Sequence, residues 1–315
     1  MHPAPSVIFF TMISGAGYGM LFLLGYGAAT RLLPPDRIFG LAGFALALGF
    51  VTIGLVSSLF HLGHPERAWR ALSQWRSSWL SREGMLAIAT YIPTAPFAVA
   101  WAFYSYNTDA IAAIGAVAGL FAAATVYATA NIYATLKPIR QWHNGWVAPV
   151  YLVLSLMSGA LWINVLLHWR GISRPTIAII AALAALAGMA LKIGYWRWID
   201  AKPAPSTPET ATGLGGIGRV RLLESPHSQE NYLLREMGFR IARKHAARLR
   251  RIALSFGFFV PLVLAGMTSA FTGQLAAWIA LAAALSAGIG VLVERWLFFA
   301  EAKHTVTLYY GQERV

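Results

Sequence analysis

Residues 6–29 read SVIFFTMISGAGYGMLFLLGYGAA, a long run without one charged side chain. A helix needs roughly 20 apolar residues to cross the hydrocarbon core of a bilayer, so this run predicts a membrane span. A cleaved signal peptide would begin with a charged region and carry a shorter apolar core. Because residues 1–5 contain no Lys or Arg, we expect the segment to be retained as a transmembrane helix.

The same pattern recurs along the whole chain. Hydrophobic residues make up 57% of the 315 residues and charged residues only 12%, against about 25% charged in a typical soluble protein. Backbone groups inside a bilayer must be hydrogen-bonded within the protein, and the strict alternation of a β-barrel is missing, so the segments are predicted as helices. The expected fold is an all-α integral membrane protein, one membrane domain over 1–315 with about eight transmembrane helices. They are predicted at 6–29, 41–60, 84–104, 110–134, 147–168, 175–196, 252–271 and 275–299.

Small residues recur at short helical spacings inside these segments. Gly15, Gly17 and Gly19 lie in the first span, and Gly115 and Gly119 lie in the fourth. Small side chains allow helix backbones to approach closely in lipid, which favours packing within one bundle. A dedicated dimer face is the alternative interpretation.

The distribution of basic residues predicts the topology. Nineteen of the 25 Lys and Arg residues lie on the side that carries both termini and the even-numbered loops. The other side carries four, and Lys192 and Arg295 fall inside predicted spans. The positive-inside rule therefore places both termini in the cytoplasm. This arrangement also explains the net charge of +13 without nucleic acid as a partner.

Residues 197–251 form the one long predicted loop. It begins with a linker rich in Pro, Ser, Thr and Gly, and it ends in a predicted basic amphipathic helix over 231–251. Such a helix fits two roles, binding to anionic lipid headgroups or docking a soluble partner. Residues 301–315 are expected to be a short polar tail.

The residue types present exclude several kinds of site. The chain has no cysteine, so it has no disulfide, no thiolate zinc site and no Cys-ligated iron–sulfur cluster of its own. Haem is not expected, because His61 and His168 lie at opposite ends of their spans. No metal site and no soluble catalytic motif is predicted, so any redox activity needs a partner that brings electrons. Lys192 and Arg295 are expected to extend toward the membrane surface, with a local Glu294–Arg295 ion pair as the alternative.

The densest polar cluster lies between the second and third spans. It runs from His61 through His64 and Arg67 to Arg82 and Glu83, with several Trp residues between them. We expect His61 to end the second span and Glu83 to begin the third, so both lie near the membrane interface. Ionisable groups at that depth indicate a functional site.

These residue types suit a quinone. A quinone offers two carbonyl oxygens to hydrogen-bond donors, and its two-electron reaction moves two protons. Histidine titrates near neutral pH, and a partly buried carboxylate can pass a proton onward. An interfacial belt of His, Arg and Trp is the competing interpretation. His143, in the loop between the fourth and fifth spans, is expected to be a surface histidine, although it could line the same pocket.

At this cluster the sequence resembles the membrane-anchor subunits of the dimethyl sulfoxide reductase type. The resemblance covers essentially the whole chain, and its most specific part is the block from residue 61 to residue 83. The matching stretches are Met1-His-Pro-Ala-Pro-Ser-Val, His61-Leu-Gly-His-Pro-Glu-Arg-Ala-Trp, Trp79-Leu-Ser-Arg-Glu, Leu136-Lys-Pro-Ile-Arg-Gln-Trp-His-Asn, and Arg221-Leu-Leu-Glu-Ser-Pro-His with Asn231-Tyr-Leu-Leu-Arg-Glu-Met.

The resemblance implies an anchor that binds a quinone, ubiquinone or menaquinone, with nothing covalently attached. The family's quinone-site histidine falls on His61 and its acidic partner on Glu83, and His64, Arg67 and Arg82 are implied neighbours. The implied partners are a molybdopterin catalytic subunit and a ferredoxin-like subunit with four iron–sulfur clusters.

The predicted topology favours one subgroup of this family. Respiratory dimethyl sulfoxide reductases carry their catalytic subunits on the periplasmic side, whereas the charge count puts the block of residues 61–83 inside. The chain therefore looks most like the anchors of cytoplasmic quinone-linked sulfite dehydrogenases, in a bacterial inner membrane with partner subunits on the cytoplasmic side. Quinol oxidation for reduction of dimethyl sulfoxide is the alternative direction.

Two other function classes fit the sequence less well. A transporter commonly shows inverted repeats and helices broken near the midplane, and neither feature is evident in this sequence. A purely structural anchor without a quinone site would tolerate replacement of His61 and Glu83.

The topology is open to a direct test. A reporter fused after Val315 is expected to read cytoplasmic, because the basic loops hold that side inside. Activity of a reporter that works only in the periplasm would contradict the predicted orientation and the cytoplasmic subgroup with it.

Overall fold

The computed structural model describes residues 4–104, 108–201, 206–224, 226 and 241–315. Within them the chain is helical, without strands, and eight helical segments are long and apolar enough to cross a membrane. The predicted eight-helix membrane fold is confirmed. The helices are α1 (Pro5–Ala29), α2 (Arg37–Leu59), α3 (Trp79–Tyr104), α4 (Asp109–Ala134), α5 (Val147–Trp169), α6 (Pro175–Ala201), a seventh span built from α9 (Ile241–Leu254), η2 (Ser255–Phe259) and α10 (Val260–Met267), and α11 (Gly273–Ala300).

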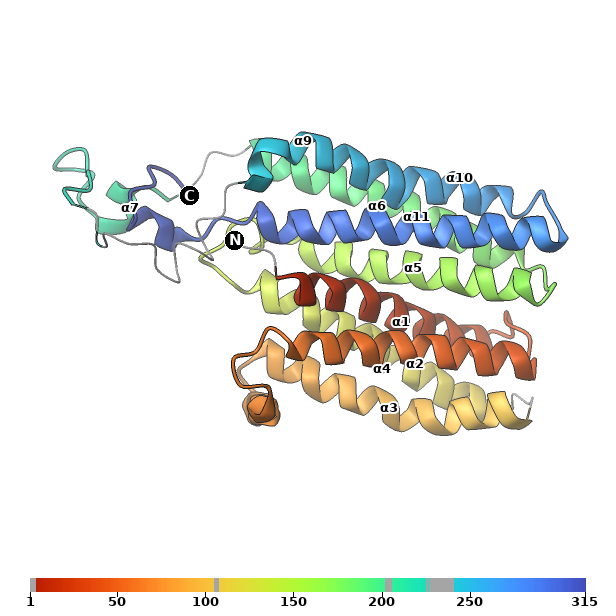
Figure 1. Ribbon diagram of the computed structural model, residues 1–315. Helices are drawn as coiled ribbons and strands as arrows, with labels where there is room; N and C mark the ends of the chain where they lie inside the picture. The colour runs from red at the N-terminus through yellow and green to blue at the C-terminus, as the bar shows by residue number, and fades with distance from the viewer. Residues whose placement is uncertain (1–3, 105–107, 202–205, 225, 227–240) are drawn as a thin grey trace.

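The helices form two groups of four that lie side by side (Figure 1). Helices α1 to α4 make one group, and α5, α6, the seventh span and α11 make the other. Helix α1 joins the groups, because it packs on α2 and α4 in its own group and on α5 and α11 in the other. Helices α1 and α5 are accordingly the most buried spans.

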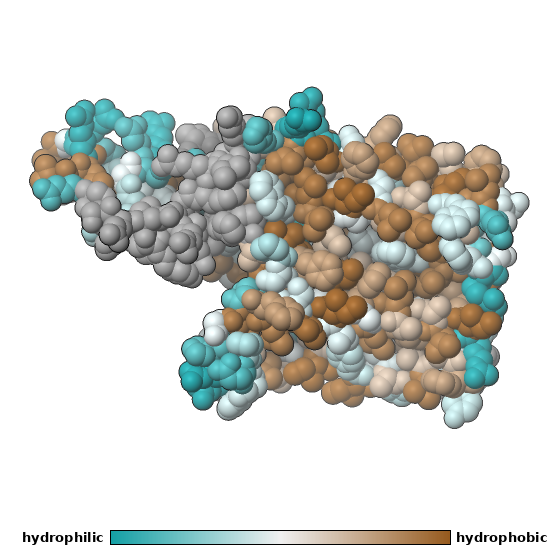
Figure 2. Space-filling model, viewed as in Figure 1, coloured by the Kyte–Doolittle hydropathy of each residue, from teal (hydrophilic) through white to brown (hydrophobic). Residues whose placement is uncertain are grey.

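The surface of the bundle fits a lipid environment. Figure 2 shows apolar side chains over the flanks of the helices and polar ones gathered at the two ends. Large apolar side chains such as Ile92, Leu183 and Leu120 are exposed on these flanks. An apolar band of this kind on a soluble protein would be an aggregation site, whereas a bilayer covers it.

Glycine permits the close crossing of α1 and α5. A Cβ built on Gly19 would collide with the carbonyl oxygen of Ser155, and one built on Gly159 would collide with the backbone of Gly19. Ser155 also donates a hydrogen bond from its Oγ to the carbonyl oxygen of Gly15, at 2.6 Å. Close backbone approach with a side chain–backbone hydrogen bond is typical of helix packing in membranes. The Gly15–Gly19 motif therefore packs within the chain, as expected.

Helix α2 begins at a well-defined cap. Asp36 accepts a hydrogen bond from the backbone N–H of Phe39 at 2.7 Å, as an N-cap residue does. Arg170, at the end of α5, donates to both carboxylate oxygens of Asp36 at 3.2 and 3.3 Å. This hydrogen-bonded ion pair holds the pKa of the Asp36 carboxyl below its usual range. The contact also joins the two helix groups at the end of the bundle away from the termini.

The seventh span contains a π-helical segment at η2. Gly257 lies in this segment directly against Gly290 of α11, where a Cβ on Gly290 would collide with Gly257 and one on Gly257 would fit only tightly. A π turn shifts the backbone hydrogen-bonding pattern, and Ser286 of α11 donates from its Oγ to the carbonyl oxygen of Phe256 at 2.8 Å. The irregular turn is therefore bound to the neighbouring helix.

Both termini lie at the same end of the bundle, called here the termini end (Figure 1). The C-terminal residues fold back on the loop after α6, since the N–H of Val315 donates to the carbonyl oxygen of Ser206 and Arg219 pairs with Glu313. The predicted polar tail is thus part of a small cap that also includes α7 (Pro208–Thr212).

Part of the predicted amphipathic helix belongs to the seventh span. Helix α9 continues through η2 into α10, so residues 241–251 form the start of one helical run. Residues 231–240 of the predicted helix lie outside the described residues.

The α1–α5 crossing yields a stability prediction. Gly19→Ala should destabilise the protein by about 1–3 kcal/mol, because the added methyl group forces two backbones apart. Thermal unfolding of the purified protein in detergent measures the loss. Gly15→Ala is the matched control, since it lies one turn earlier and a Cβ there meets nothing within 4 Å. Equal unfolding temperatures for the two variants would contradict the crossing.

Candidate functional site

His61 lies in the turn that follows α2. The helix ends at Leu59 rather than at His61, and residues 61–64 are all exposed. Next to this turn, His64 contacts Glu66 through Nδ1 at 3.1 Å, and Arg67 lies 3.6 Å from the same carboxylate. The turn therefore presents both histidines at the surface of the termini end. His143, expected at the surface, is also exposed.

A short 3-10 helix, η1 (Pro65–Gln74), connects this turn to α3. Trp69 and Trp75 are exposed on the connection, with Arg70 and Arg76 stacked over their rings. Arg82 closes the connection, because its guanidinium donates to the carbonyl oxygens of Trp75 at 2.9 Å and Arg76 at 2.7 Å. Arg82 thus holds the end of the 61–78 segment against the start of α3.

Glu83 lies inside the bundle. Helix α3 begins at Trp79 rather than near residue 84, so Glu83 falls in its second turn and is only 5% exposed. Thr129 of α4 donates a hydrogen bond to its Oε1 at 2.5 Å. Tyr18, Tyr133 and Tyr151 are near enough to interact with it electrostatically. The prediction that Glu83 begins the third helix is wrong by about one turn, because the helix extends beyond the apolar segment.

The structure separates the two main predicted site residues into different environments. Glu83 is enclosed by helices, and His61 is on the outer turn. Within the described residues, no hydrogen bond or ion pair joins His61 to Glu83. Arg82 is adjacent to Glu83 in sequence but points to the carbonyls of residues 75 and 76. The site as described therefore has an outer imidazole and an inner carboxylate.

A second group of ionisable side chains is buried between α6 and α11. Lys192 lies 2.6 Å from one carboxylate oxygen of Glu294, and Arg295 lies 2.7 Å from the other. All three are at most 2% exposed. The prediction that Lys192 and Arg295 extend to the membrane surface is therefore wrong, and the alternative Glu294–Arg295 ion pair is present. Neither cation reaches water from the interior of the bundle. The ion pairs with Glu294 stabilise the two positive charges instead.

Aromatic rings complete the surroundings of both cations. The Nζ of Lys192 lies 4.1 Å from the ring centre of Tyr195 and 4.6 Å from that of Trp196. The guanidinium carbon of Arg295 lies 3.9 Å from the ring centre of Tyr151. Cation–π contacts of this kind gain strength when the cation is desolvated. We call Lys192, Glu294 and Arg295 the buried ion cluster.

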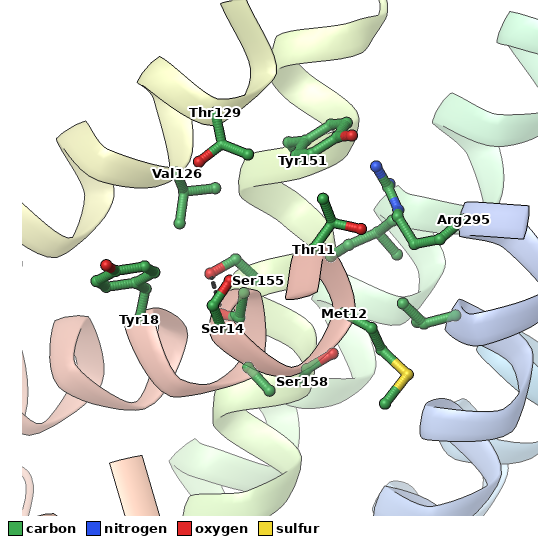
Figure 3. A pocket seen from close by; sticks show the side chains of 14 residues that line it. Thr11, Met12, Ser14, Tyr18, Val126, Thr129, Tyr151, Ser155, Ser158 and Arg295 are labelled. Atoms are coloured by element: carbon green, nitrogen blue, oxygen red, sulfur yellow. Dashed lines mark hydrogen bonds between the residues drawn. The ribbon is translucent and has the colours of Figure 1, made fainter. Parts of the chain in front are cut away.

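A small cavity lies where the two helix groups meet (Figure 3). Its volume is about 20 Å³, which is room for one water molecule. Thr129 of α4, Tyr151 of α5 and Arg295 of α11 line it, together with Tyr18 and Ser158. The cavity thus lies between the hydroxyl that binds Glu83 and the guanidinium of the buried ion cluster.

A third polar network lies at the termini end. Arg250 pairs with Asp200 at 2.6 Å and with Glu301 at 2.9 Å, and so joins the ends of α6, α9 and α11. Burial raises the pKa of the Glu301 carboxyl, although the ion pair with Arg250 opposes this effect. This network is a structural clamp at the rim of the bundle.

The sequence contained a signal for the buried ion cluster. Charges within apolar spans are rare and mark functional sites by default, and residues 192, 294 and 295 are all within predicted spans. What the sequence did not show was that α6 and α11 are neighbours. In the part of the chain that the structure describes, no group of three His, Asp or Glu side chains could hold a metal ion.

The comparison with known proteins identifies the kind of subunit. Residues 1–299 match the model of the DMSO reductase anchor subunit. The chain belongs to the DMSO reductase anchor subunit family. Family membership agrees with a bundle of eight helices that are long and apolar enough to cross a membrane.

One curated relative is similar over its full length. The chain is 31% identical to a sulfite dehydrogenase subunit of Allochromatium vinosum, over 98% of this chain and 99% of that protein. No solved structure gives a significant match. The protein is therefore a multi-pass membrane anchor of an oxidoreductase complex family, similar to a sulfite dehydrogenase subunit.

The hydrogen bond from Thr129 to Glu83 yields a prediction. Thr129→Val keeps the side-chain shape but leaves a buried carboxyl without its donor, which should cost about 1–3 kcal/mol of stability. Thermal unfolding in detergent measures this loss. Thr125→Val is the matched control, because Thr125 lies one turn earlier on α4 and its hydroxyl contacts the neutral Thr90 hydroxyl and the carbonyl oxygen of Phe121. The valine keeps the backbone carbonyl that accepts from Thr129. A larger loss in the control than in Thr129→Val would contradict the assigned contact.

Proposed function

We propose that this anchor subunit binds a quinone at the termini end and passes electrons between an iron–sulfur partner subunit and the quinone pool. One observation carries the proposal: a carboxyl group, Glu83, is buried one turn inside α3 and hydrogen-bonded to Thr129, close in sequence to an exposed His61 turn. A buried carboxyl and an accessible imidazole at the same end of the bundle suit the proton exchange that quinone chemistry requires.

The role proposed for each residue follows from its position in the structure. His61, on the outer turn, is available to hydrogen-bond a quinone carbonyl oxygen and to exchange a proton with water. Glu83, shielded from water, exchanges the second proton, and Thr129 orients its carboxyl group. His64 and Arg67 line the same turn. Arg82 holds the 61–78 segment in place through two backbone carbonyls.

The partner subunits belong at the same end of the bundle. The proposed partners are a ferredoxin-like subunit with four clusters and a molybdopterin catalytic subunit, which supply the electrons. The termini end offers the 61–78 connection and the cap of residues 206–224 and 301–315 as a polar surface. With that end inside, the complex is proposed to oxidise sulfite in the cytoplasm and to reduce quinone in a bacterial inner membrane. The similarity to a sulfite dehydrogenase subunit supports this substrate over dimethyl sulfoxide.

Replacement of the two proposed quinone-site residues tests this function. The complex is purified from its native membranes through a tag after Val315, and quinone-linked turnover is compared with turnover of an artificial dye that takes electrons from the partner subunits. His61→Ala and Glu83→Gln should each lower quinone-linked turnover tenfold or more, since general acid–base groups contribute about 100-fold to 10,000-fold. Dye-linked turnover should be unchanged.

Asp109→Asn is the control, because it removes an exposed carboxyl at the end of the bundle away from the termini. It should leave both activities within about twofold. Equal loss of quinone-linked and dye-linked turnover in Glu83→Gln would indicate failed assembly, and unchanged quinone-linked turnover in both site variants would refute the assigned site.

A further inference from the structure

The described residues of the eight spans hold four buried side chains that can carry charge at neutral pH. They are Glu83 on α3, Lys192 on α6, and Glu294 and Arg295 on α11. A fifth buried carboxyl, Glu301, follows the last residue of α11, where it pairs with Arg250 and also acts on Lys192 electrostatically. Two of the four are acids and two are bases. The set is therefore electrically neutral only when Glu83 is a carboxylate. Because a net charge in a low-dielectric interior is costly, this balance couples Glu83 to the other three groups.

The buried ion cluster by itself carries one excess positive charge. Glu294 is held between Lys192 and Arg295, so its single negative charge is shared by two cations. Arg295 uses its Nε for this ion pair, and the rest of its guanidinium interacts with the neutral Tyr151 side chain. The excess charge is thus located at a guanidinium that lines the cavity.

On the side of the cavity away from Arg295, the lining residue Thr129 contacts Glu83. Thr129 lines the cavity and donates its hydroxyl hydrogen to Glu83. Tyr151 lies between the two sides, against the Arg295 guanidinium and within electrostatic reach of Glu83. Tyr151 interacts with the Arg295 guanidinium through its side chain, and the buried Tyr18 hydroxyl makes no hydrogen bond within the described residues. The path from the cation to the carboxylate therefore passes through dipoles and a water-sized space, with no intervening charge.

We propose that the Lys192–Glu294–Arg295 cluster is the counter-charge of the Glu83 carboxylate and sets the pH at which Glu83 gains and loses its proton. The inference rests on the proposed function in one respect, namely that this proton is the one exchanged with quinone. The three residues are positioning residues that act through the electric field. No proton or electron passes through them.

The other groups that face Glu83 do not supply this charge. Helix α2 carries its charged residue, Arg37, at the far end, and Arg82 on α3 is directed to two backbone carbonyls outside the bundle. The charged residues of the 61–78 connection are exposed, so water screens them. The remaining facing groups are neutral: Tyr18 on α1, Thr129 and Tyr133 on α4, and Tyr151 on α5.

Variants that change the cluster charge in opposite directions test the proposal. Lys192→Met lowers the net charge from +1 to 0, Glu294→Gln raises it to +2, and the double variant returns it to +1. In the intact complex, infrared titration follows the carboxyl C=O band of Glu83, which is identified by its loss in Glu83→Gln. This readout needs no quinone turnover.

The expected shifts have opposite signs. With less positive charge nearby, the protonated form of Glu83 persists to higher pH, so Lys192→Met should raise the pH midpoint by about one unit. Glu294→Gln should lower the midpoint by a similar amount, and the double variant should restore the wild-type value. Structural damage alone would not shift the midpoint in opposite directions in the two single variants and restore it in the double variant. If Glu294→Gln fails to assemble, Lys192→Met and the double variant still carry the test.

Lys137→Met is the matched control, because it removes the same charge from an exposed position at the termini end, where water and salt screen it. It should move the midpoint by less than about 0.2 units. Unchanged midpoints in both single variants, shifts of the same sign, or a double variant that does not return to wild type would each overturn the assignment.

The experiment separates this inference from the proposed function. If the variants show the expected infrared shifts but even the wild-type complex has no quinone-linked turnover, the quinone function is refuted and the counter-charge is supported. If the wild-type complex turns over quinone normally, and the cluster variants change neither the pH profile of that turnover nor the infrared midpoint, the counter-charge alone is refuted.

Discussion

A hydrocarbon layer does not solvate charge, and this constraint governs where the ionisable groups lie in the described part of the chain. Most of the 25 basic residues are at the two ends of the bundle, where water reaches them. The described exceptions, Lys192 and Arg295, are both paired with Glu294 and covered by aromatic rings. The pairing requires α6 and α11 to lie together, so the charge constraint also fixes part of the helix arrangement.

The same constraint makes helix packing depend on small residues. Because lipid tails are as apolar as leucine, hydrophobic burial does not draw one transmembrane helix to another. Close backbone contact takes its place, at Gly19 against Ser155 and at Gly257 against Gly290. Helix α1 uses such a contact to join the two helix groups, and the cavity lies beside that junction. The polar interior is thus a consequence of how the groups meet.

Membership of the DMSO reductase anchor subunit family gives this architecture a context. In the function proposed above, the anchor holds soluble redox subunits at one membrane face and binds quinone near them. The termini end concentrates the features that suit this role, namely the exposed His61 turn, the buried Glu83 and the cap formed by the loop after α6 with the C-terminal residues. The buried ion cluster lies within the same half of the spans, because Glu294 is two turns from the end of α11.

The sequence alone determined the number of spans, their approximate bounds, the family and the block that contains His61 and Glu83. Apolar run length determines a span whatever its neighbours are, which is why the eight segments were predictable. Only the tertiary structure decided that Glu83 meets Thr129 of α4, that Lys192 meets Glu294, and that a cavity separates these contacts. In a soluble helix the apolar face would have indicated which side is inward. Here the lipid-facing side is as apolar as the packed side, so the sequence pattern does not indicate which helices are neighbours.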